Sequence, residues 1–162
     1  MGDIYVEQIV KRKKTKVDLL KKILLIIAVT LSIFLGLGRP LWFILTIILI
    51  VVSAIVFRNM NIEYEYIYFN GELDIDRICG KQSRKRVYST DINEVLVVAP
   101  LGSLELQQYR KEKGFDYSSK RPEANVYELV SNHRGKRVKI AFEPNEKMLK
   151  GMHMMAPRKV FM

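Results

Sequence analysis

Side chains whose type and spacing suit chemistry are few in this 162-residue sequence. Asp74 and Asp76 lie two positions apart, and on an extended strand that spacing puts both carboxylates on one face. Such a pair suits acid–base chemistry or cation binding, but no His, Cys or Ser is placed to complete a mechanism. A solvated strand face accounts for the same spacing, and we favour it. We therefore expect the protein not to be an enzyme.

The thiol and imidazole side chains likewise give no indication of a catalytic site. Cys79 is the single cysteine, so it cannot form an internal disulfide or a cysteine-based zinc cluster. We expect a buried thiol in a reducing compartment. His133 and His153 have no partners at ligand spacing, so we expect no metal site and no cofactor.

Basic side chains are the more informative group, because the formal net charge is +10. Residues 1–22 hold seven basic and three acidic side chains, beside the most apolar sequence, which favours anionic lipid over nucleic acid. The sequence also lacks an RNA-binding signature and a helix-turn-helix, so no nucleic-acid partner is expected. A second basic group occupies residues 134–139. The candidate lipid- or anion-binding residues are Lys81, Arg84, Lys85 and Arg86, for which a nonspecific membrane-facing or solubilising surface is the alternative.

Two uncharged apolar runs, residues 23–38 and 41–57, predict a transmembrane helical hairpin. Each run is slightly short for a hydrocarbon core of ~30 Å, but Leu19 and Leu20 extend the first if Lys21 and Lys22 reach the headgroups. A cleaved signal peptide is disfavoured because a second apolar run follows. One continuous span is disfavoured because Pro40 breaks a helix.

The charges that flank the hairpin predict its orientation. Basic residues precede the first span and follow the second, which places both termini in the cytoplasm and the protein in the cell membrane as a multi-pass protein. The chain then divides into a basic cytoplasmic segment (1–22), the hairpin (23–57) and a cytoplasmic domain (58–162). Residues 4–10 suit either a short interfacial helix or a frayed, solvated tail. The predicted membrane-flanking residues are Lys11, Arg12, Lys13, Lys14, Lys21, Lys22, Arg39, Trp42 and Arg58.

After Arg58 the apolar periodicity changes from helical to alternating, which predicts strands. The strands are expected at about 62–69, 73–76, 84–89, 94–99, 126–130 and 137–142, with Asn70-Gly71 as a hairpin turn. A helix from the N-cap Ser103 to about Lys113 and a loop over 115–123 interrupt them. A closing helix from Pro144 carries an apolar stripe, which we expect to be core, and a tail follows from Arg158. The stripe consists of Met148, Leu149, Met152 and Met155.

This order of elements resembles the pleckstrin-homology-like (PH-like) architecture over roughly residues 62–156. The fold class is therefore expected to be a membrane helical hairpin plus an α+β domain, an antiparallel β-sandwich or barrel closed by a C-terminal helix. The whole chain also resembles a family of small two-span membrane proteins of Gram-positive anaerobes with no assigned activity, so the resemblance implies a structural class and not an activity. It lies in the stretches MGDIYVEQIVKRK (1–13), NIEYEYIYFNGELDIDRI (61–78), FEPNEKMLKG (142–151) and APRKVF (156–161).

Two hypotheses for function follow. The first is a membrane-anchored, non-enzymatic binding or scaffolding module that presents the PH-like domain at the cytoplasmic membrane surface. Its partners would be the lipid bilayer together with anionic lipid headgroups or a protein. The alternative is a structural subunit of a larger membrane protein complex, whose spans pack against other helices through small residues. Those small residues are Ser32, Gly36, Ser53 and Ala54.

Overall fold

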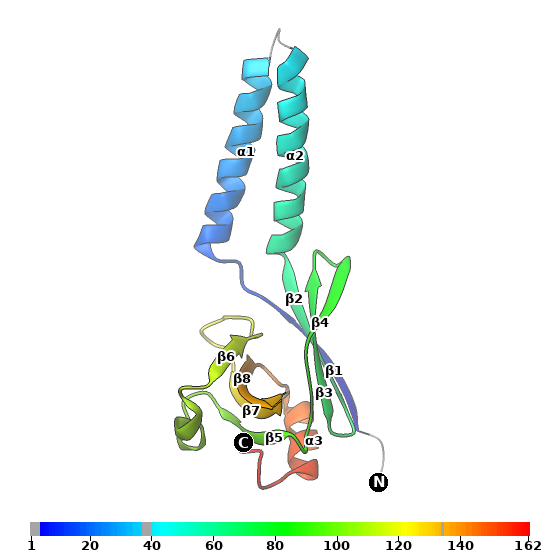
Figure 1. The fold of residues 1–162 in the computed structure, drawn as a ribbon, viewed down its shortest axis with the longest axis vertical. Coiled ribbons are helices and arrows are strands. Elements are labelled where there is room, and N and C mark those ends of the chain that lie inside the picture. The colour runs from blue at the N-terminus through cyan, green and yellow to red at the C-terminus, as the bar shows by residue number, and fades with distance from the viewer. Residues whose placement is uncertain (1–3, 37–39, 134) are drawn as a thin grey trace. The chain divides into compact units, whose positions relative to one another are not determined.

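The computed structural model describes residues 4–36, 40–133 and 135–162 (Figure 1). The chain forms two compact units, and each is described by itself. The hairpin unit comprises Lys14–Ile62 and Cys79–Ser83, and the PH-like unit comprises the residues up to Lys13, Glu63–Ile78 and Arg84–Met162. The elements in chain order are β1 (Tyr5–Lys11), α1 (Lys16–Gly36), α2 (Pro40–Met60), β2 (Ile62–Phe69), β3 (Glu72–Cys79), β4 (Ser83–Asp91), β5 (Val95–Pro100), η1 (Leu104–Tyr109), β6 (Lys113–Asp116), β7 (Tyr127–His133), β8 (Lys136–Phe142) and α3 (Glu146–Met155).

Helices α1 and α2 pack side by side in the hairpin unit and are both long and apolar enough to cross a membrane. Each has 21 residues, which at ~1.5 Å per residue matches a hydrocarbon core of ~30 Å. In the most apolar 18-residue stretch of each helix, only 11% is buried. A core helix of a soluble protein would be mostly buried, so these helices leave most of their apolar surface exposed.

Helix α1 begins earlier than the predicted span, at Lys16, because Thr15 caps it. The Thr15 backbone N–H and hydroxyl both donate to the Asp18 carboxylate, at 2.9 and 2.7 Å, and the Asp18 N–H donates back to the Thr15 hydroxyl. This reciprocal capping box satisfies donors that a helix start otherwise leaves unpaired. The pattern Thr-x-x-Asp is visible in the sequence and marks this start.

Small side chains line the contact between the two helices. Ser32 and Gly36 of α1 and Thr46 and Ser53 of α2 are buried. The three hydroxyls donate to carbonyl oxygens three or four residues earlier, at 2.7–3.0 Å, so no buried hydroxyl is left unpaired among them. Three of the four small residues predicted to pack against other helices are thus used within the hairpin, whereas Ala54 is exposed.

The PH-like unit contains two four-stranded sheets and α3, which confirms the predicted fold class. The first sheet has the order β1-β2-β3-β4 and the second the order β5-β7-β8-β6. The Asn70-Gly71 turn between β2 and β3 is confirmed, with positive φ at both residues, as the tightest hairpins require. The separate strand orders describe a sandwich of two sheets, a choice that the sequence left open against a closed barrel.

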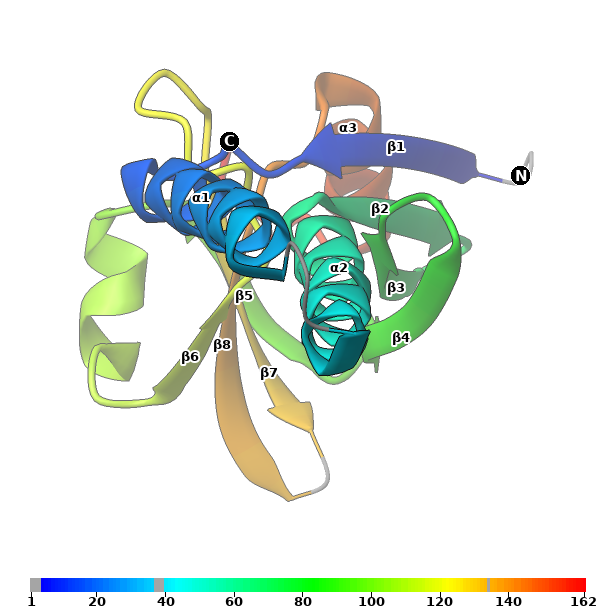
Figure 2. The same ribbon diagram turned by 90° about the horizontal axis from the view of Figure 1, so that it is seen from above.

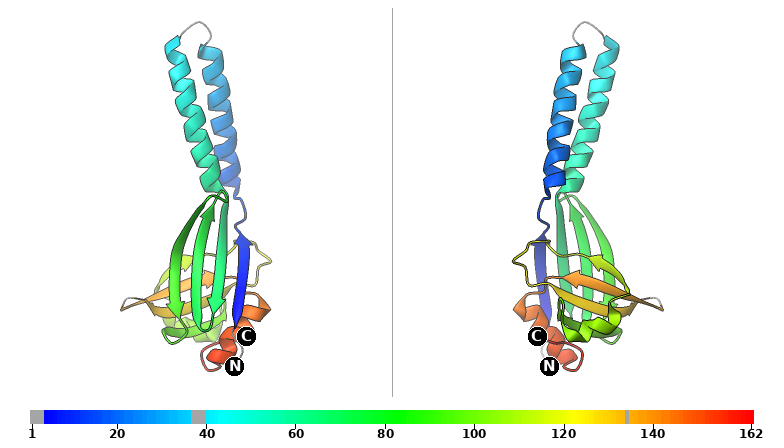
Figure 3. Two further views of the ribbon diagram at one scale, coloured as in Figure 1. Left: turned by 90° about the vertical axis from the view of Figure 1, so that its right-hand side faces the viewer. Right: turned by 90° about the vertical axis from the view of Figure 1, so that its left-hand side faces the viewer.

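Strand β1 is the main correction to the predicted elements. Residues 5–11 are neither a helix nor a frayed tail: they pair antiparallel with β2, from Tyr5 opposite Phe69 to Lys11 opposite Glu63 (Figure 3). Val6 and Val10 are buried and the residues between them are more exposed, which is the alternation of a half-buried strand. The PH-like unit therefore begins before the hairpin, which the expected domain boundary at residue 58 does not anticipate.

The core lies between the sheets and α3. Tyr66 and Phe142, from different sheets, meet edge to face with their ring centroids 5.8 Å apart. Helix α3 covers the sandwich next to β1, and Gly151 permits this approach because a Cβ there would lie 2.9 Å from the Ile4 side chain (Figure 2). Met148 and Met152 are fully buried, as the predicted stripe requires, but Met155 is exposed.

Three local expectations in the C-terminal half are wrong. The expected helix from Ser103 is a short 3-10 helix, η1, and Ser103 makes no side-chain capping bond to it. The first residues of the expected loop over 115–123 belong instead to a strand, β6, which pairs parallel with β8. Asn145, and not Pro144, starts α3, because its side chain accepts from the Met148 N–H at 2.8 Å.

The C-terminal residues are not a tail. Val160 is buried and bridges Val98 of β5 in a parallel arrangement. The ammonium of Lys159 donates to the carbonyl oxygens of Ile92 and Asn93, at 3.1 and 3.0 Å. The end of the chain thus extends the packing around β5.

Candidate functional site

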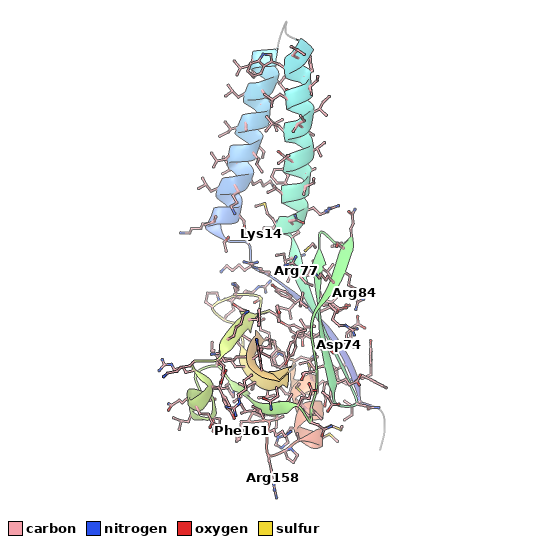
Figure 4. The ribbon with its side chains drawn as sticks, viewed as in Figure 1. Lys14, Asp74, Arg77, Arg84, Arg158 and Phe161 are labelled. Atoms are coloured by element: carbon pink, nitrogen blue, oxygen red, sulfur yellow. The ribbon has the colours of Figure 1, made fainter. Side chains whose placement is uncertain are left out.

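Two of the four candidate anion-binding residues have carboxylate partners within the PH-like unit. Arg84 donates from Nε to Asp76 at 2.6 Å and contacts Glu65 through a terminal nitrogen. Arg86 contacts Asp74 at 2.9 Å and lies 3.5 Å from the other oxygen of Asp76. Arg84 and Asp74 extend from neighbouring strands of the first sheet (Figure 4). The donor groups that would bind a phosphate in two-pronged fashion are therefore engaged.

These contacts belong to a larger set of charges on the first sheet, here called the charged row. On β2 the tyrosines 64, 66 and 68 are buried and face the core, so Glu65 lies on the opposite face by strand alternation. Every strand of the sheet contributes. The charged row consists of Glu7 (β1), Glu65 (β2), Asp74 and Asp76 (β3), and Arg84 and Arg86 (β4).

Two carboxylates of the charged row are buried, so its ion pairs are not all at the surface. Glu65 and Asp76 are only 5% and 4% exposed, so the expectation of a solvated carboxylate face is wrong for Asp76. Burial raises the pKa of Glu65, an effect that Arg84 opposes and a hydrogen bond with Glu7 reinforces. The same hydrogen bond, together with one from the Tyr5 hydroxyl at 2.7 Å, lowers the pKa of Glu7. The pKa values of the two glutamates are therefore shifted in opposite directions by the hydrogen bond that links them.

The other two candidates lie apart from these ion pairs. Lys85 is exposed on β4, between the two arginines in sequence. Lys81 belongs to the hairpin unit, where it occupies the β3–β4 turn with a φ of 60°. Specific lipid or anion binding by the four residues stays a prediction, and it would require the arginines to exchange carboxylates for phosphate.

The residues of the second basic group are also only partly available. Lys139 of β8 pairs with Glu128 of β7 at 3.2 Å, and both side chains are mostly buried. Lys136 and Arg137 are exposed, and Arg134 lies outside the described residues.

The predicted membrane-flanking residues divide between the two units. Lys11 lies in β1 and pairs with Glu63 at 3.3 Å, and the Lys13 N–H donates to Ser119, so this part of the basic segment is folded into the PH-like unit. Arg12 lies between them in the same unit. The other described residues are in the hairpin unit, and Arg39 lies outside the described part of the chain. Lys14 precedes α1, Lys21 and Lys22 lie in its first two turns, Trp42 is near the start of α2, and Arg58 is near its end.

Cys79 and His153 are the remaining candidates for chemistry. Cys79 is a buried free thiol, as predicted. The His153 ring nitrogen Nδ1 lies 3.0 Å from the Val160 carbonyl oxygen. Within the described ranges, no group of three or more His, Cys, Asp and Glu side chains is placed to hold a metal ion.

Sequence reasoning identified Asp74 and Asp76 but missed the other two acidic residues of the charged row, Glu7 and Glu65. The sequence from Tyr5 to Lys11 carried no period-2 signal for β1, and therefore none for Glu7, because its apolar residues come in two pairs separated by Glu7-Gln8. The partnership of Glu65 with Arg84 had no local signal, because it depends on which strands are neighbours.

Comparison with protein families adds one finding. A family model described as a bacterial PH-like domain (DUF6106) matches residues 2–162. The chain belongs to this bacterial PH-like domain family. The match covers β1 and both apolar helices as well as the two sheets. No curated protein and no solved structure matches the chain.

Proposed function

We propose that the protein is a membrane-anchored, non-enzymatic binding or scaffolding module that presents its PH-like domain at the cytoplasmic membrane surface. The observation that supports this most is the position of the hairpin within the domain. The hairpin lies between β1 and β2, which are antiparallel neighbours in one sheet, with Lys11 opposite Glu63. Both ends of the hairpin therefore connect to adjacent positions of one folded unit.

This connection constrains the topology. A folded sheet cannot be divided across a bilayer, so two helices that leave from paired strands must start and finish on the same side. Two apolar helices that cross the hydrocarbon core meet that requirement. The lysines before α1 and Arg58 at the end of α2 support the cytoplasm as that side, because the positive-inside rule associates such flanking charges with it.

Two anchoring points would also restrict the domain more than one flexible linker does. A module held at the membrane has a high effective concentration for partners on that surface, so weak intrinsic affinity is sufficient. The alternative, a structural subunit that packs through small residues, has less support because Ser32, Gly36 and Ser53 are buried between α1 and α2.

The experiment that tests the proposal is cysteine labelling of the full-length protein in bacterial protoplasts. In a Cys79→Ser background, single cysteines replace Arg39 (between the helices in sequence), Asn59 or Met162. We expect an impermeant maleimide to label position 39 in intact protoplasts and positions 59 and 162 only after permeabilisation. Extraction of the protein by alkaline carbonate, or equal labelling of all three positions, would overturn the anchored topology.

A further inference from the structure

A cavity of about 360 Å³ lies between the start of α1 and the end of α2 in the hairpin unit. Leu19 of α1 and Phe57 and Met60 of α2 supply its apolar wall. Lys14, Lys16 and Lys22 also line it, and Figure 4 shows Lys14 where the chain enters α1. Its volume falls in the range of small-ligand sites, which are concave, mostly apolar and carry a few polar groups.

A second hollow adjoins the cavity along the helix pair. This groove has a volume of about 320 Å³, and Phe57 lines both hollows. Its other lining residues are aliphatic or small and lie further along the two helices, including Val29, Ile50 and Ala54. None of the described residues that line the groove is charged. The helix pair thus has a basic cavity at one end and, on the other side of the shared Phe57, a mostly apolar groove.

The lysines of the cavity outnumber the single acidic side chain among the described residues that line it. Among the described residues, no ion pair involves Lys14, Lys16 or Lys22, and all three are exposed. The Lys22 ammonium lies 5.9 Å from the centre of the Phe57 ring. Asp18 also lines the cavity, but its carboxylate accepts from the N–H and hydroxyl of Thr15. Three lysines against one aspartate leave the cavity with a positive charge.

We propose that this cavity and groove form one binding site for an anionic phospholipid. The lysines bind the phosphate of the headgroup, and an acyl chain lies in the groove between the helices. This inference rests on the proposed function, because the groove meets lipid chains only if the hairpin crosses the membrane. Basic pockets between membrane helices on the cytoplasmic side have the chemistry that holds anionic headgroups.

The combination of a basic cavity and an apolar groove favours an anionic phospholipid over inorganic phosphate or a zwitterionic lipid. Inorganic phosphate would use the lysines but leave the groove unfilled. A zwitterionic lipid would fill the groove but carries no net charge for the lysines. Only a ligand with both an anionic head and a hydrocarbon chain matches both hollows, and the end of the groove at Phe57 sets where head and chain join.

The test uses full-length protein purified in detergent and analysed by native mass spectrometry. Phosphatidylglycerol, phosphatidylcholine or inorganic phosphate is added at matched concentrations. We expect phosphatidylglycerol to be retained at least about tenfold more tightly than phosphatidylcholine, since each nearby lysine strengthens binding of an anionic head. We expect no retained inorganic phosphate, and retention of phosphate equal to that of phosphatidylglycerol would overturn the role of the groove.

Matched variants separate the site from general charge attraction. The triple variant Lys14→Gln, Lys16→Gln, Lys22→Gln is expected to bind phosphatidylglycerol only as tightly as phosphatidylcholine. The control removes the same charge from exposed lysines of the PH-like unit, through Lys111→Gln, Lys113→Gln, Lys147→Gln, and is expected to retain the preference. An equal loss of preference in both variants would overturn the site.

A groove variant tests the acyl-chain half independently. Ala54→Phe fills the groove from an exposed position, so the buried contact between the helices is left intact. It is expected to weaken both lipids, whereas Val52→Phe, on an exposed position outside the groove, is not. Protein that resists alkaline carbonate but shows none of these effects would contradict the lipid site alone, whereas carbonate-extracted protein would contradict the proposed function.

Discussion

Arg84 contacts Asp76 and Glu65, which lie on the two strands beyond its own, and its side chain is half-exposed while both carboxylates are buried. A buried carboxylate needs a charged or hydrogen-bonding partner because burial removes its hydration. Arg84 therefore serves the stability of the first sheet. The value of the interaction lies mainly in what its loss would leave behind, namely two buried carboxylates with reduced compensation.

Replacing this arginine tests that role. Arg84→Gln is expected to lower the free energy of unfolding by about 1–3 kcal/mol, the cost of under-compensated buried acceptors. Lys85→Gln, at the next position, removes the same charge without a described carboxylate partner and is expected to change stability by less than about 0.5 kcal/mol. Thermal and urea unfolding of the full-length protein in detergent measure both. Equal effects of the two substitutions would refute the pairing.

The linked glutamates predict a pH dependence. The pKa of Glu65 is raised above the ordinary value of 4.5, so the folded state holds a proton that the unfolded chain releases, and stability falls as pH rises above 4.5. The pKa of Glu7 is lowered, so its contribution is lost as pH falls below 4.5. Glu65→Gln keeps a hydrogen-bond donor toward Glu7 but removes the titration. We expect the variant's stability to vary less than the wild type's between pH 4.5 and neutrality, as followed by thermal unfolding; an unchanged slope would count against the linkage.

At the scale of elements, β1 decides where the domain begins. It buries Val6 and Val10 and covers the edge of β2. Without it, β2 would present unpaired backbone groups, which promote association between molecules. The hydrogen bonds of the Gln8 side chain with Glu143 and Asn145, both at 2.8 Å, also connect β1 to the start of α3.

Removing β1 is therefore expected to be costly. A variant that lacks residues 4–13 loses two buried valines, worth about 3–6 kcal/mol together, and exposes an edge strand. We expect it to aggregate or to unfold at much lower temperature than the full-length protein, as measured by size-exclusion chromatography and circular dichroism in detergent. A matched variant, Tyr5→Ser with Ile9→Ser, changes exposed residues of the same strand and is expected to stay folded.

The cap of α3 offers a smaller effect at the same scale. Asn145→Ala removes the acceptor of the Met148 N–H and is expected to lower the free energy of unfolding by about 1 kcal/mol. Asn145→Asp preserves an acceptor and is expected to be nearly neutral. Urea unfolding compares the two; an equal loss in both would mean that the amide nitrogen, and not the cap, matters.

At the scale of the whole molecule, the insertion of the hairpin between neighbouring strands connects anchor and domain through two chain segments. Lys11 and Glu63 face each other across β1 and β2, so the ends of a much shorter connection would also meet there. The PH-like unit does not require the apolar helices to close its first sheet.

This predicts that a soluble form can be made by shortening the connection. Replacing residues 14–60 by a Gly-rich turn of about four residues would join β1 to β2 as an ordinary hairpin. We expect this protein to be monomeric in water without detergent, whereas residues 59–162 alone, which lack β1, would not be. Analytical ultracentrifugation compares the two. A soluble, folded 59–162 chain would show that β1 is dispensable.

Several features were predictable because their signals are local. The two apolar runs indicated helices, the alternation after Arg58 indicated β2, and Asn70-Gly71 indicated its turn. Each depends on the periodicity or backbone freedom of nearby residues. Residues 5–11 lack this alternation, because Tyr5-Val6 and Ile9-Val10 are apolar pairs separated by Glu7-Gln8. Such a segment next to a run of lysines resembles an amphipathic helix until a partner strand is known.

The partnerships of the charged row were not predictable in this way. Lys81, Arg84, Lys85 and Arg86 form one basic group in sequence, but the fold pairs Arg84 and Arg86 with carboxylates and leaves Lys85 exposed. Residue composition and periodicity thus established a basic protein with two apolar helices and a β-rich domain. Only the tertiary structure decided that a strand before the hairpin completes the domain, and which positive charges stay unpaired, because strand order brings together side chains from distant parts of the chain.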